Sequence, residues 1–264
     1  MKKECIDIGA NLTSPSFHED LEEVIDRAVI NGIKTMIITG TSIRASHEAL
    51  ELAKKKPGIL YCTAGVHPHD ARHCNDRTLE SLKCLSENKE VVALGECGLD
   101  YNRNFSPPDV QDYWFEAQIE LACHLKKPLF LHERDAHNSF LSILKKHREK
   151  LPQTVVHCFT GNEQELKAYI SQNFYIGITG WICDERRGVH LRNILKYIPL
   201  DRLMIETDAP YLLPRTMPRR PASGRNEPAF LLYTLKMVAS CLKKSEEEIA
   251  SITTENAKKF FEIP

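Results

Sequence analysis

The sequence predicts an α/β protein with a (β/α)8 barrel, or TIM barrel, formed as a single domain by residues 1–264. Three observations lead to this prediction. Eight short apolar runs, rich in β-branched residues, alternate with segments of helical periodicity. The length of 264 residues suits one such barrel. Side chains that can bind a metal recur after four of the runs, where this fold places its active site.

The apolar runs are expected to be strands buried on both faces, as is typical of a parallel sheet covered by helices. They are Cys5–Gly9, Ile33–Thr39, Leu60–Val66, Val91–Leu94, Pro128–Leu131, Thr154–Val156, Phe174–Gly177 and Leu203–Ile205. The expected helices are Phe17–Val29, Ile43–Lys54, Thr78–Leu85, Val110–Leu125, Ala136–Arg148, Glu163–Ile170, Val189–Tyr197, Phe230–Leu242 and Ser245–Phe261. The Pro- and Arg-rich stretch 214–228 is expected to be a loop after the last strand.

Four of these strands lead into a side chain that can bind a metal. These side chains are Glu96, with Asp100 close behind it, His132, His157 and Asp208. Taken singly, each has a simpler explanation as a salt-bridged acid or a hydrogen-bonded core histidine. In a parallel barrel all four would converge on one face, so we expect a metal centre there. Two imidazoles and two carboxylates suit magnesium or manganese with water completing the shell, or zinc in a tight site.

The composition limits the classes of partner. A net charge of −1 argues against a broad basic surface, so any nucleic acid must be bound by a local patch. Nine cysteines, an odd number without paired spacing, are expected to be reduced, which favours a cytoplasmic protein. No apolar stretch is long enough to span a membrane, and Met1–Glu4 leads into a strand rather than a signal peptide. We expect no membrane partner and see no sign of an obligate protein partner.

Six motifs are spread along nearly the whole chain. They are Thr63–Pro68 (TAGVHP), Gly95–Asp100 (GECGLD), Leu131–His132, Val156–Gly161 (VHCFTG), Glu206–Tyr211 (ETDAPY) and Arg225–Pro228 (RNEP). In this order they resemble the TatD family of metal-dependent deoxyribonucleases, which belongs to the amidohydrolase-like barrels. Two further runs, Asp7–Thr13 and Gly180–Gly188, resemble one branch of that family more than the family at large.

One departure from the family pattern concerns the first strand. Most members carry His-x-His where this sequence has Gly9 and Asn11. Glycine offers no side-chain ligand, and an amide is a weak replacement for imidazole. The departure therefore predicts that the two metal positions differ in affinity, with at most one ion bound firmly in the absence of substrate.

The resemblance implies a role for each site residue. Glu96, His132 and His157 would bind a divalent metal, with Mg²⁺ as the first choice and Mn²⁺ or Zn²⁺ as alternatives. Asp208 would contact the metal and take a proton from the attacking water, so Asp208 and Glu96 are the expected catalytic residues. The expected contacts to substrate are His67, Arg134, Arg225 and Asn11.

The function implied by the resemblance is hydrolysis of phosphodiester bonds from the 3′ end of single-stranded DNA, with RNA as a second substrate, in DNA repair or turnover. Two alternatives stay open. Related barrels hydrolyse amides or esters, and such an enzyme would not need arginines around its site. The missing histidines at Gly9 and Asn11 also allow a non-catalytic quality-control protein, which would bind metal without turnover.

Overall fold

The computed structural model describes residues 4–264. Residues 1–3, which were interpreted as a lead into the first strand, lie outside the described residues. Eight strands form one sheet in the order of the chain. They are β1 (Cys5–Ala10), β2 (Ile33–Ile38), β3 (Leu60–Ala64), β4 (Val91–Asp100), β5 (Leu129–Arg134), β6 (Thr154–Val156), β7 (Tyr175–Ile178) and β8 (Leu203–Ile205).

The first and last strands are neighbours. The N–H of Asn11 donates to the carbonyl of Ala209 (2.6 Å), and Ala10 and Ala209 form a parallel bridge. A sheet whose strands follow the chain order and whose first strand lies beside the last is that of a (β/α)8 barrel. The predicted fold class is confirmed.

Helices follow the strands along the chain. They are α1 (Leu21–Ile30), α2 (Ile43–Lys55), α3 (Asp76–Ser86), α4 (Pro108–Leu125), α5 (His137–Lys146), α6 (Glu163–Ser171), α7 (Val189–Ile194), α8 (Leu231–Leu242) and α9 (Glu246–Phe261). Several begin at a side-chain cap, because the first N–H groups of a helix lack internal partners. Ser42 caps α2, and Asn75 and Asn162 form capping boxes on α3 and α6. None of the helices described for residues 4–264 is both long and apolar enough to span a membrane.

The helix expected to begin at Phe17 begins later, at Leu21. Residues Pro15–Phe17 form a separate 3₁₀ turn, capped by the hydroxyl of Ser14. Proline is favoured at the start of such a turn because its missing N–H would have no partner there. The sequence pattern of apolar residues did not separate this turn from the helix.

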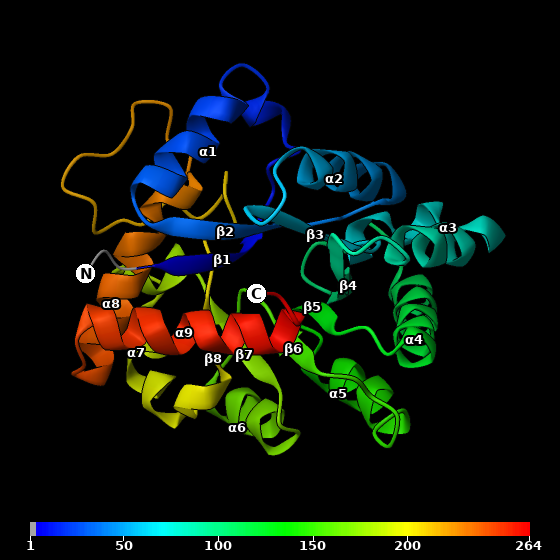
Figure 1. The fold of residues 1–264 in the computed structure, drawn as a ribbon. Helices are drawn as coiled ribbons and strands as arrows, with labels where there is room; N and C mark the ends of the chain where they lie inside the picture. Colours follow the sequence, from blue (N-terminus) through cyan, green and yellow to red (C-terminus); the bar gives the residue numbers. More distant parts are fainter. Residues whose placement is uncertain (1–3) are drawn as a thin grey trace. The chain divides into compact units, whose positions relative to one another are not determined.

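The contacts divide the chain into two compact units. Figure 1 labels the helices and strands of each. The central unit comprises Thr39–His157 and Phe260–Glu262. The terminal unit comprises the chain up to Ile38, Cys158–Lys259 and Ile263–Pro264. The expectation that residues 1–264 form a single domain stays a prediction.

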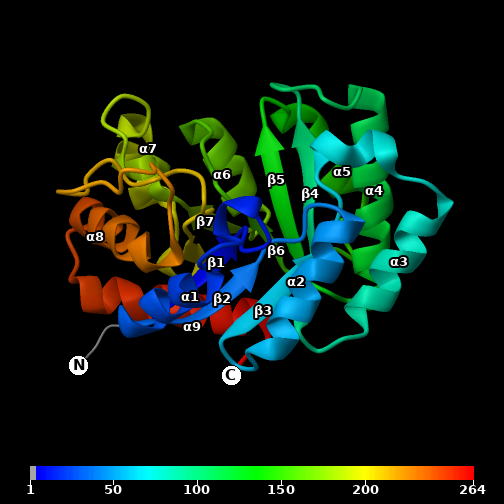
Figure 2. The same cartoon turned by 90° about the horizontal axis from the view of Figure 1, so that it is seen from above.

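The central unit holds β3 to β6. These strands pair in parallel in chain order, and α2, α3 and α4 pack against β3 and β4 (Figure 2). Phe115 of α4 stacks on Phe140 of α5 with ring centroids 5.2 Å apart, and both side chains are fully buried. The terminal unit contains the parallel pairs β1–β2 and β7–β8, whose apolar residues are buried throughout β7 and β8.

β4 is longer than the sequence indicated. The prediction ended the strand at Leu94 and placed Glu96 and Asp100 beyond it, but all ten residues from Val91 to Asp100 are strand. The pairing with β5 shifts register between Gly95 and Cys97. Gly95 has φ +134°, and a Cβ there would lie 2.0 Å from the carbonyl oxygen of Phe130. Glycine thus marks an irregularity within the strand rather than its end.

Candidate metal centre

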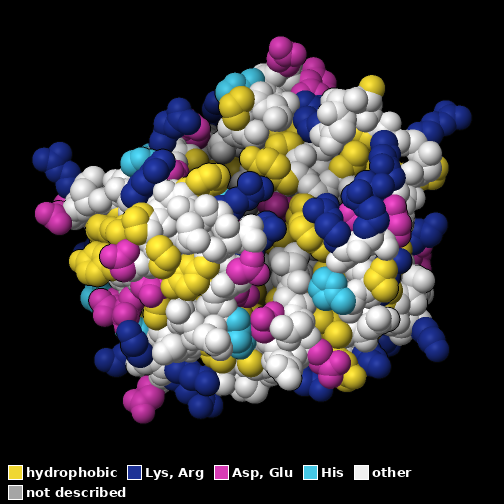
Figure 3. Space-filling model, turned by 180° about the vertical axis from the view of Figure 1, so that it is seen from behind, with side chains coloured by type: hydrophobic (Ala, Val, Ile, Leu, Met, Phe, Trp, Pro, Cys, Tyr) yellow, Lys and Arg dark blue, Asp and Glu magenta, His cyan; other side chains and the backbone are white. Residues whose placement is uncertain are grey.

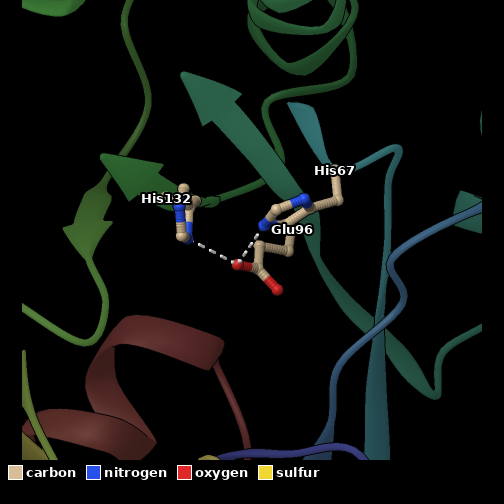
Figure 4. A group of neighbouring side chains, drawn as sticks. All are labelled: His67, Glu96 and His132. Carbon is tan, nitrogen blue, oxygen red and sulfur yellow. Dashed lines mark ion pairs between the residues drawn. The ribbon is translucent and has the colours of Figure 1, made fainter. Parts of the chain in front are cut away.

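Glu96 is the centre of a cluster of imidazoles in the central unit. It lies just after Gly95 in β4, and its side chain is 7% exposed. One carboxylate oxygen, Oε1, lies 2.7 Å from His157 Nε2, 3.0 Å from His132 Nδ1 and 3.3 Å from His67 Nε2. Figure 4 shows the rings of His67, which follows β3, and His132 of β5 approaching this oxygen. The predicted convergence of Glu96, His132 and His157 is thus present.

Parallel pairing brings the three histidines to this place. His132 lies within β5, His157 follows β6 directly, and His67 comes shortly after β3. The N–H of His157 donates to the carbonyl of Leu131, which extends the pairing of β5 and β6 to the site (2.9 Å). The carboxyl ends of neighbouring parallel strands meet at one edge of a sheet, so residues far apart in sequence become neighbours.

The protonation of the cluster follows from burial and charge. Burial raises the pKa of Glu96, but electrostatic interactions with His157 and His67 and hydrogen bonds from His132 and His157 outweigh burial and hold it well below its usual range. Burial lowers the pKa of His67 to about 4. For His132, burial is outweighed by interactions with Asp100 and Glu96, and its pKa is raised. Glu96 is therefore an ionised acceptor at neutral pH.

These donors fit a divalent cation. Ligand atoms of His67, Glu96 and His132 all lie within 4.8 Å of one another. Imidazole nitrogens and a carboxylate oxygen are ordinary ligands of such ions. His132 Nε2 is buried and makes no hydrogen bond to residues 4–264, since Asp100 Oδ2 at 3.5 Å is an ion-pair contact only, so its hydrogen bonding is incomplete without a further group. The grouping includes His67, which the sequence analysis had assigned to substrate rather than to metal.

A second carboxylate, Asp100, lies beside His132. The sequence placed it close behind Glu96 but gave it no role of its own. Its Oδ2 lies 2.8 Å from His69 Nε2 and 3.5 Å from His132 Nε2. The N–H groups of Asn102 and Arg103 donate to Oδ1. Burial raises the pKa of Asp100, but the interactions with His132 and His69 outweigh it, so the pKa lies far below its usual range. The carboxylate is therefore charged beside the ring of His132.

In the sequence, His69 and His73 follow the third apolar run, and both are expected to be exposed loop histidines. For His69 this expectation is wrong. The side chain is 32% exposed and is held by Asp100. The 3₁₀ segment Pro68–His73 follows His67 directly and turns His69 toward β4. His73, by contrast, is 64% exposed and pairs with Asp70, as expected for a loop histidine.

Asp208 lies in the terminal unit, and its contacts are described there alone. Its Oδ1 accepts a hydrogen bond from Asn11 Nδ2 (2.9 Å), and its N–H donates to the carbonyl of Gly9 (2.8 Å). The backbone of Asp208 has φ +54°. The preceding residue, Thr207, donates from its N–H (2.9 Å) and its hydroxyl to the buried carboxyl group of Asp7. The first strand thus positions Asp208 through Asn11 and the segment around Thr207.

Arg134 lies in the same strand as His132. It is the last residue of β5 and lies two positions after His132. Side chains two positions apart in a strand point to the same face. Arg134 therefore lies on the same face of the sheet as His132, and its contact with substrate stays a prediction.

The guanidinium of Arg225 makes hydrogen bonds within the protein. Its guanidinium donates to both carboxylate oxygens of Asp20 (2.7 and 2.6 Å), to Glu227 (2.8 Å) and to the carbonyl of Ser16 (2.6 Å). It also lies over the ring of Phe17, 4.9 Å from the centroid. These contacts join the loop after β8 to the segment before α1. The predicted role of Arg225 in binding phosphate remains open beside this structural role.

We expect Arg225→Ala to lower the free energy of unfolding by about 1.5–3 kcal/mol, because charged hydrogen bonds to partly buried carboxylates are lost. Urea denaturation followed by circular dichroism measures the change, with the exposed Arg219→Ala as the matched control. Unchanged stability together with weaker binding of DNA would instead make Arg225 a substrate contact.

A (β/α)8 barrel with a buried carboxylate and imidazoles at the carboxyl ends of its strands is suited to bind a divalent metal. The chain belongs to the family of TatD related DNases, whose pattern it matches over residues 6–262. It is 51% identical over 258 residues to a protein of Erwinia billingiae and 47% identical over 257 residues to one of Salmonella typhimurium. Both are named 3′-5′ ssDNA/RNA exonuclease TatD, and the alignments cover 97–98% of this chain and 98–99% of theirs.

Solved structures of the same family are also similar. A TatD homologue of Escherichia coli K12 matches with a TM-score of 0.90 and 29% identity over 100% of both chains. A TatD family hydrolase of Entamoeba histolytica matches with a TM-score of 0.88 and 28% identity over 98% of both chains. The resemblance read from the sequence motifs is confirmed.

Proposed function

We propose that this protein is a metal-dependent exonuclease that removes nucleotides from the 3′ end of single-stranded DNA, with RNA as a second substrate. The proposal is carried by identity of about 50% along nearly the whole chain to proteins named for that activity. The buried carboxylate of Glu96, surrounded by three imidazoles, provides a centre suited to the chemistry. A role in DNA repair or turnover follows from the activity.

In this proposal Glu96, His132 and His157 hold a divalent ion, with His67 at the same oxygen of Glu96. We infer Mg²⁺ in the cell, since it tolerates a shell completed by water, while Mn²⁺ and Zn²⁺ fit the same donors. A bound ion supplies positive charge that offsets the charge of the reacting phosphate and acidifies water.

Asp208 is the proposed general base. Its carboxylate accepts a proton from the attacking water, and the amide of Asn11 holds Oδ1 so that the group keeps one orientation (2.9 Å). Asn11 thus acts on the reaction through Asp208, in addition to the substrate contact expected from the sequence.

Phosphate must be bound locally. Lys and Arg side chains are interspersed with Asp and Glu on the face shown in Figure 3, without a continuous basic surface. This agrees with a net charge of −1. Arg134 and His67 are the proposed local contacts, because guanidinium and imidazole N–H groups donate to phosphate oxygens. A cytoplasmic location and the lack of an obligate protein partner remain predictions from the sequence.

Digestion of a single-stranded oligonucleotide labelled at its 5′ or 3′ end tests the proposed function. We expect immediate release of the 3′ label, gradual shortening of the 5′-labelled strand, loss of both in EDTA and recovery with Mg²⁺. An amide or ester hydrolase would leave the oligonucleotide intact. A quality-control protein would bind metal and show no turnover, so either result would replace the proposal.

The contact between Asp100 and His132 predicts a measurable effect on the metal. Asp100→Asn removes the charge that faces His132 Nε2 and should lower metal affinity about 10–100-fold, the usual effect of losing a carboxylate behind a metal-binding histidine. Isothermal titration calorimetry with Mn²⁺ measures the change, and Asp109→Asn, an exposed acid in the first turn of α4, is the control. Equal affinities in the two variants would show that Asp100 supports only the fold.

The first strand predicts how many ions bind. Gly9 and Asn11 offer no imidazole, so calorimetry of the DNA-free protein should find at most one firmly bound ion. Gly9→His combined with Asn11→His should raise the number toward two and shift preference toward zinc. The double variant loses the Asn11–Asp208 hydrogen bond, so its fold is checked first by circular dichroism. Two tight, equivalent sites in the unchanged protein would contradict this prediction.

A further inference from the structure

The loops after β7 and β8 enclose a pocket in the terminal unit. Its volume is about 210 Å³, and it is lined by Gly180, Trp181, Asp184, Arg187, Leu212, Leu213 and Arg215. A Cβ on Gly180 would lie 2.3 Å from the carbonyl oxygen of Leu212. The absence of a side chain at Gly180 therefore allows the two loops to approach closely enough to form one pocket.

One wall of the pocket is an aromatic ring held in place. Arg187 lies over the ring of Trp181, 4.3 Å from its centroid, and Trp181 Nε1 donates to the carbonyl of Arg187 (3.3 Å). Leu212 and Leu213 supply apolar surface from the loop after β8. Indole and leucine side chains together present a surface on which a flat, unpaired base can stack.

The second feature of the pocket is a group of arginines that pair with Asp184. This carboxylate is 4% exposed and accepts from Arg186 (2.9 and 3.2 Å to backbone and side-chain nitrogens) and from Arg187 Nε (3.2 Å). Arg215 lies 3.9 Å from Asp184 and 3.3 Å from the exposed Glu185. Three guanidinium groups against two carboxylates leave an excess of one positive charge. Both of these contacts of Arg215 are made through Nε, so its terminal nitrogens keep N–H donors for a further anion.

We propose that this pocket is a subsite for one nucleotide of a single-stranded substrate, with the base against Trp181 and Leu213 and the phosphate at Arg215. The proposal rests on the proposed nuclease function. It agrees with the general tendency of (β/α)8 barrels to bind phosphate at the loops after the seventh and eighth strands. Base stacking and guanidinium contacts to phosphate do not depend on base identity, so the subsite would accept any sequence.

The pocket contains one of the two tryptophans of the chain, which provides a local reporter. Trp114→Phe leaves Trp181 as the single tryptophan. Titrating this variant with thymidine 5′-monophosphate in EDTA should change Trp181 emission in a saturable way. Thymidine alone and inorganic phosphate alone should bind at least fivefold more weakly, because each lacks one half of the interaction.

Arg215→Gln in the same background should weaken nucleotide affinity about 10- to 150-fold, as expected for charged hydrogen bonds to phosphate. Arg219→Gln is the matched control, since Arg219 is exposed and does not line the pocket. Circular dichroism verifies the fold of each variant, and Arg187→Gln repeats the test from the other side of the pocket. The affinity is measured without hydrolysis, so it is independent of whether the protein is a nuclease.

The subsite is overturned if the nucleotide leaves Trp181 emission unchanged, or if Arg215→Gln and Arg219→Gln bind it equally well. If Arg215→Gln weakens a saturable response but the protein fails to digest DNA, the result would support the nucleotide subsite and refute the proposed nuclease function. If the protein digests DNA but Trp181 emission does not respond, the result would support the nuclease function and refute the subsite.

Discussion

Glu96→Gln is expected to abolish nuclease activity and to lower divalent-metal affinity by more than the 10–100-fold typical of partners that only support a ligand. The amide keeps the size of the side chain but loses the negative charge that faces His67, His132 and His157 at 2.7–3.3 Å. Loss of that charge removes the one anion of the cluster in the central unit that all three imidazoles share.

Calorimetric titration with Mn²⁺ and digestion of labelled DNA measure the two effects, and circular dichroism verifies that the fold is retained. Glu116→Gln on α4 is the matched control, because it makes the same chemical change at an acid that pairs with Lys146 away from the cluster. His132→Ala and His157→Ala should also lose activity and metal affinity. Normal metal content in all three site variants would refute the assignment.

Asp208→Asn is expected to keep much of the metal affinity and to lose about 10²–10⁴-fold in turnover, the range usual for a general base. The amide is nearly the same size as the carboxylate but cannot accept a proton from water. It can still accept from Asn11 through its oxygen, so the local backbone contacts to Gly9 should survive.

Single-turnover digestion at saturating Mg²⁺ separates the catalytic effect from metal binding. Asp201→Asn, an exposed acid just before β8, is the control. Turnover close to that of the unchanged protein would show that Asp208 is not the general base and only orients the turn after β8.

The sequence predicted the strands well because buried parallel strands are apolar throughout. Thr154–Val156 and Leu203–Ile205 are strands with the bounds expected. The end of β4 could not be predicted in this way, because glycines at 95 and 98 resemble a strand terminus. In the structure they permit a close approach of β4 to β5, where any Cβ would lie within 2.0 Å of a β5 carbonyl oxygen.

The convergence of side chains at the strand ends was predictable, but the groups that support them were not. Glu96, His132 and His157 follow from where apolar runs end. The pairing of His69 with Asp100, 31 positions apart, depends on a 3₁₀ segment whose direction is set by tertiary contacts. Arg225 likewise pairs with Asp20, 205 positions away, and no local pattern distinguishes such an ion pair from a phosphate contact.

The structure shows what Asn11, at the departure from the family pattern, does in the fold. Asn11 takes the place of a histidine and its amide binds Asp208 instead of presenting a ring nitrogen. An amide N–H can hold a carboxylate but cannot replace imidazole as a metal ligand. We therefore expect Asn11 to orient Asp208 without supplying an imidazole for a second ion, which agrees with the stoichiometry predicted above.

Anomalous diffraction from crystals soaked in Mn²⁺ without DNA tests the metal centre most directly. The account predicts one strong manganese peak within coordinating distance of Glu96 Oε1 and a nitrogen of His132, which now lie 3.0 Å apart. Mn²⁺ prefers the same oxygen and nitrogen donors as the proposed site offers. A manganese peak elsewhere, with the Glu96 carboxylate still bound only by imidazoles, would contradict the account.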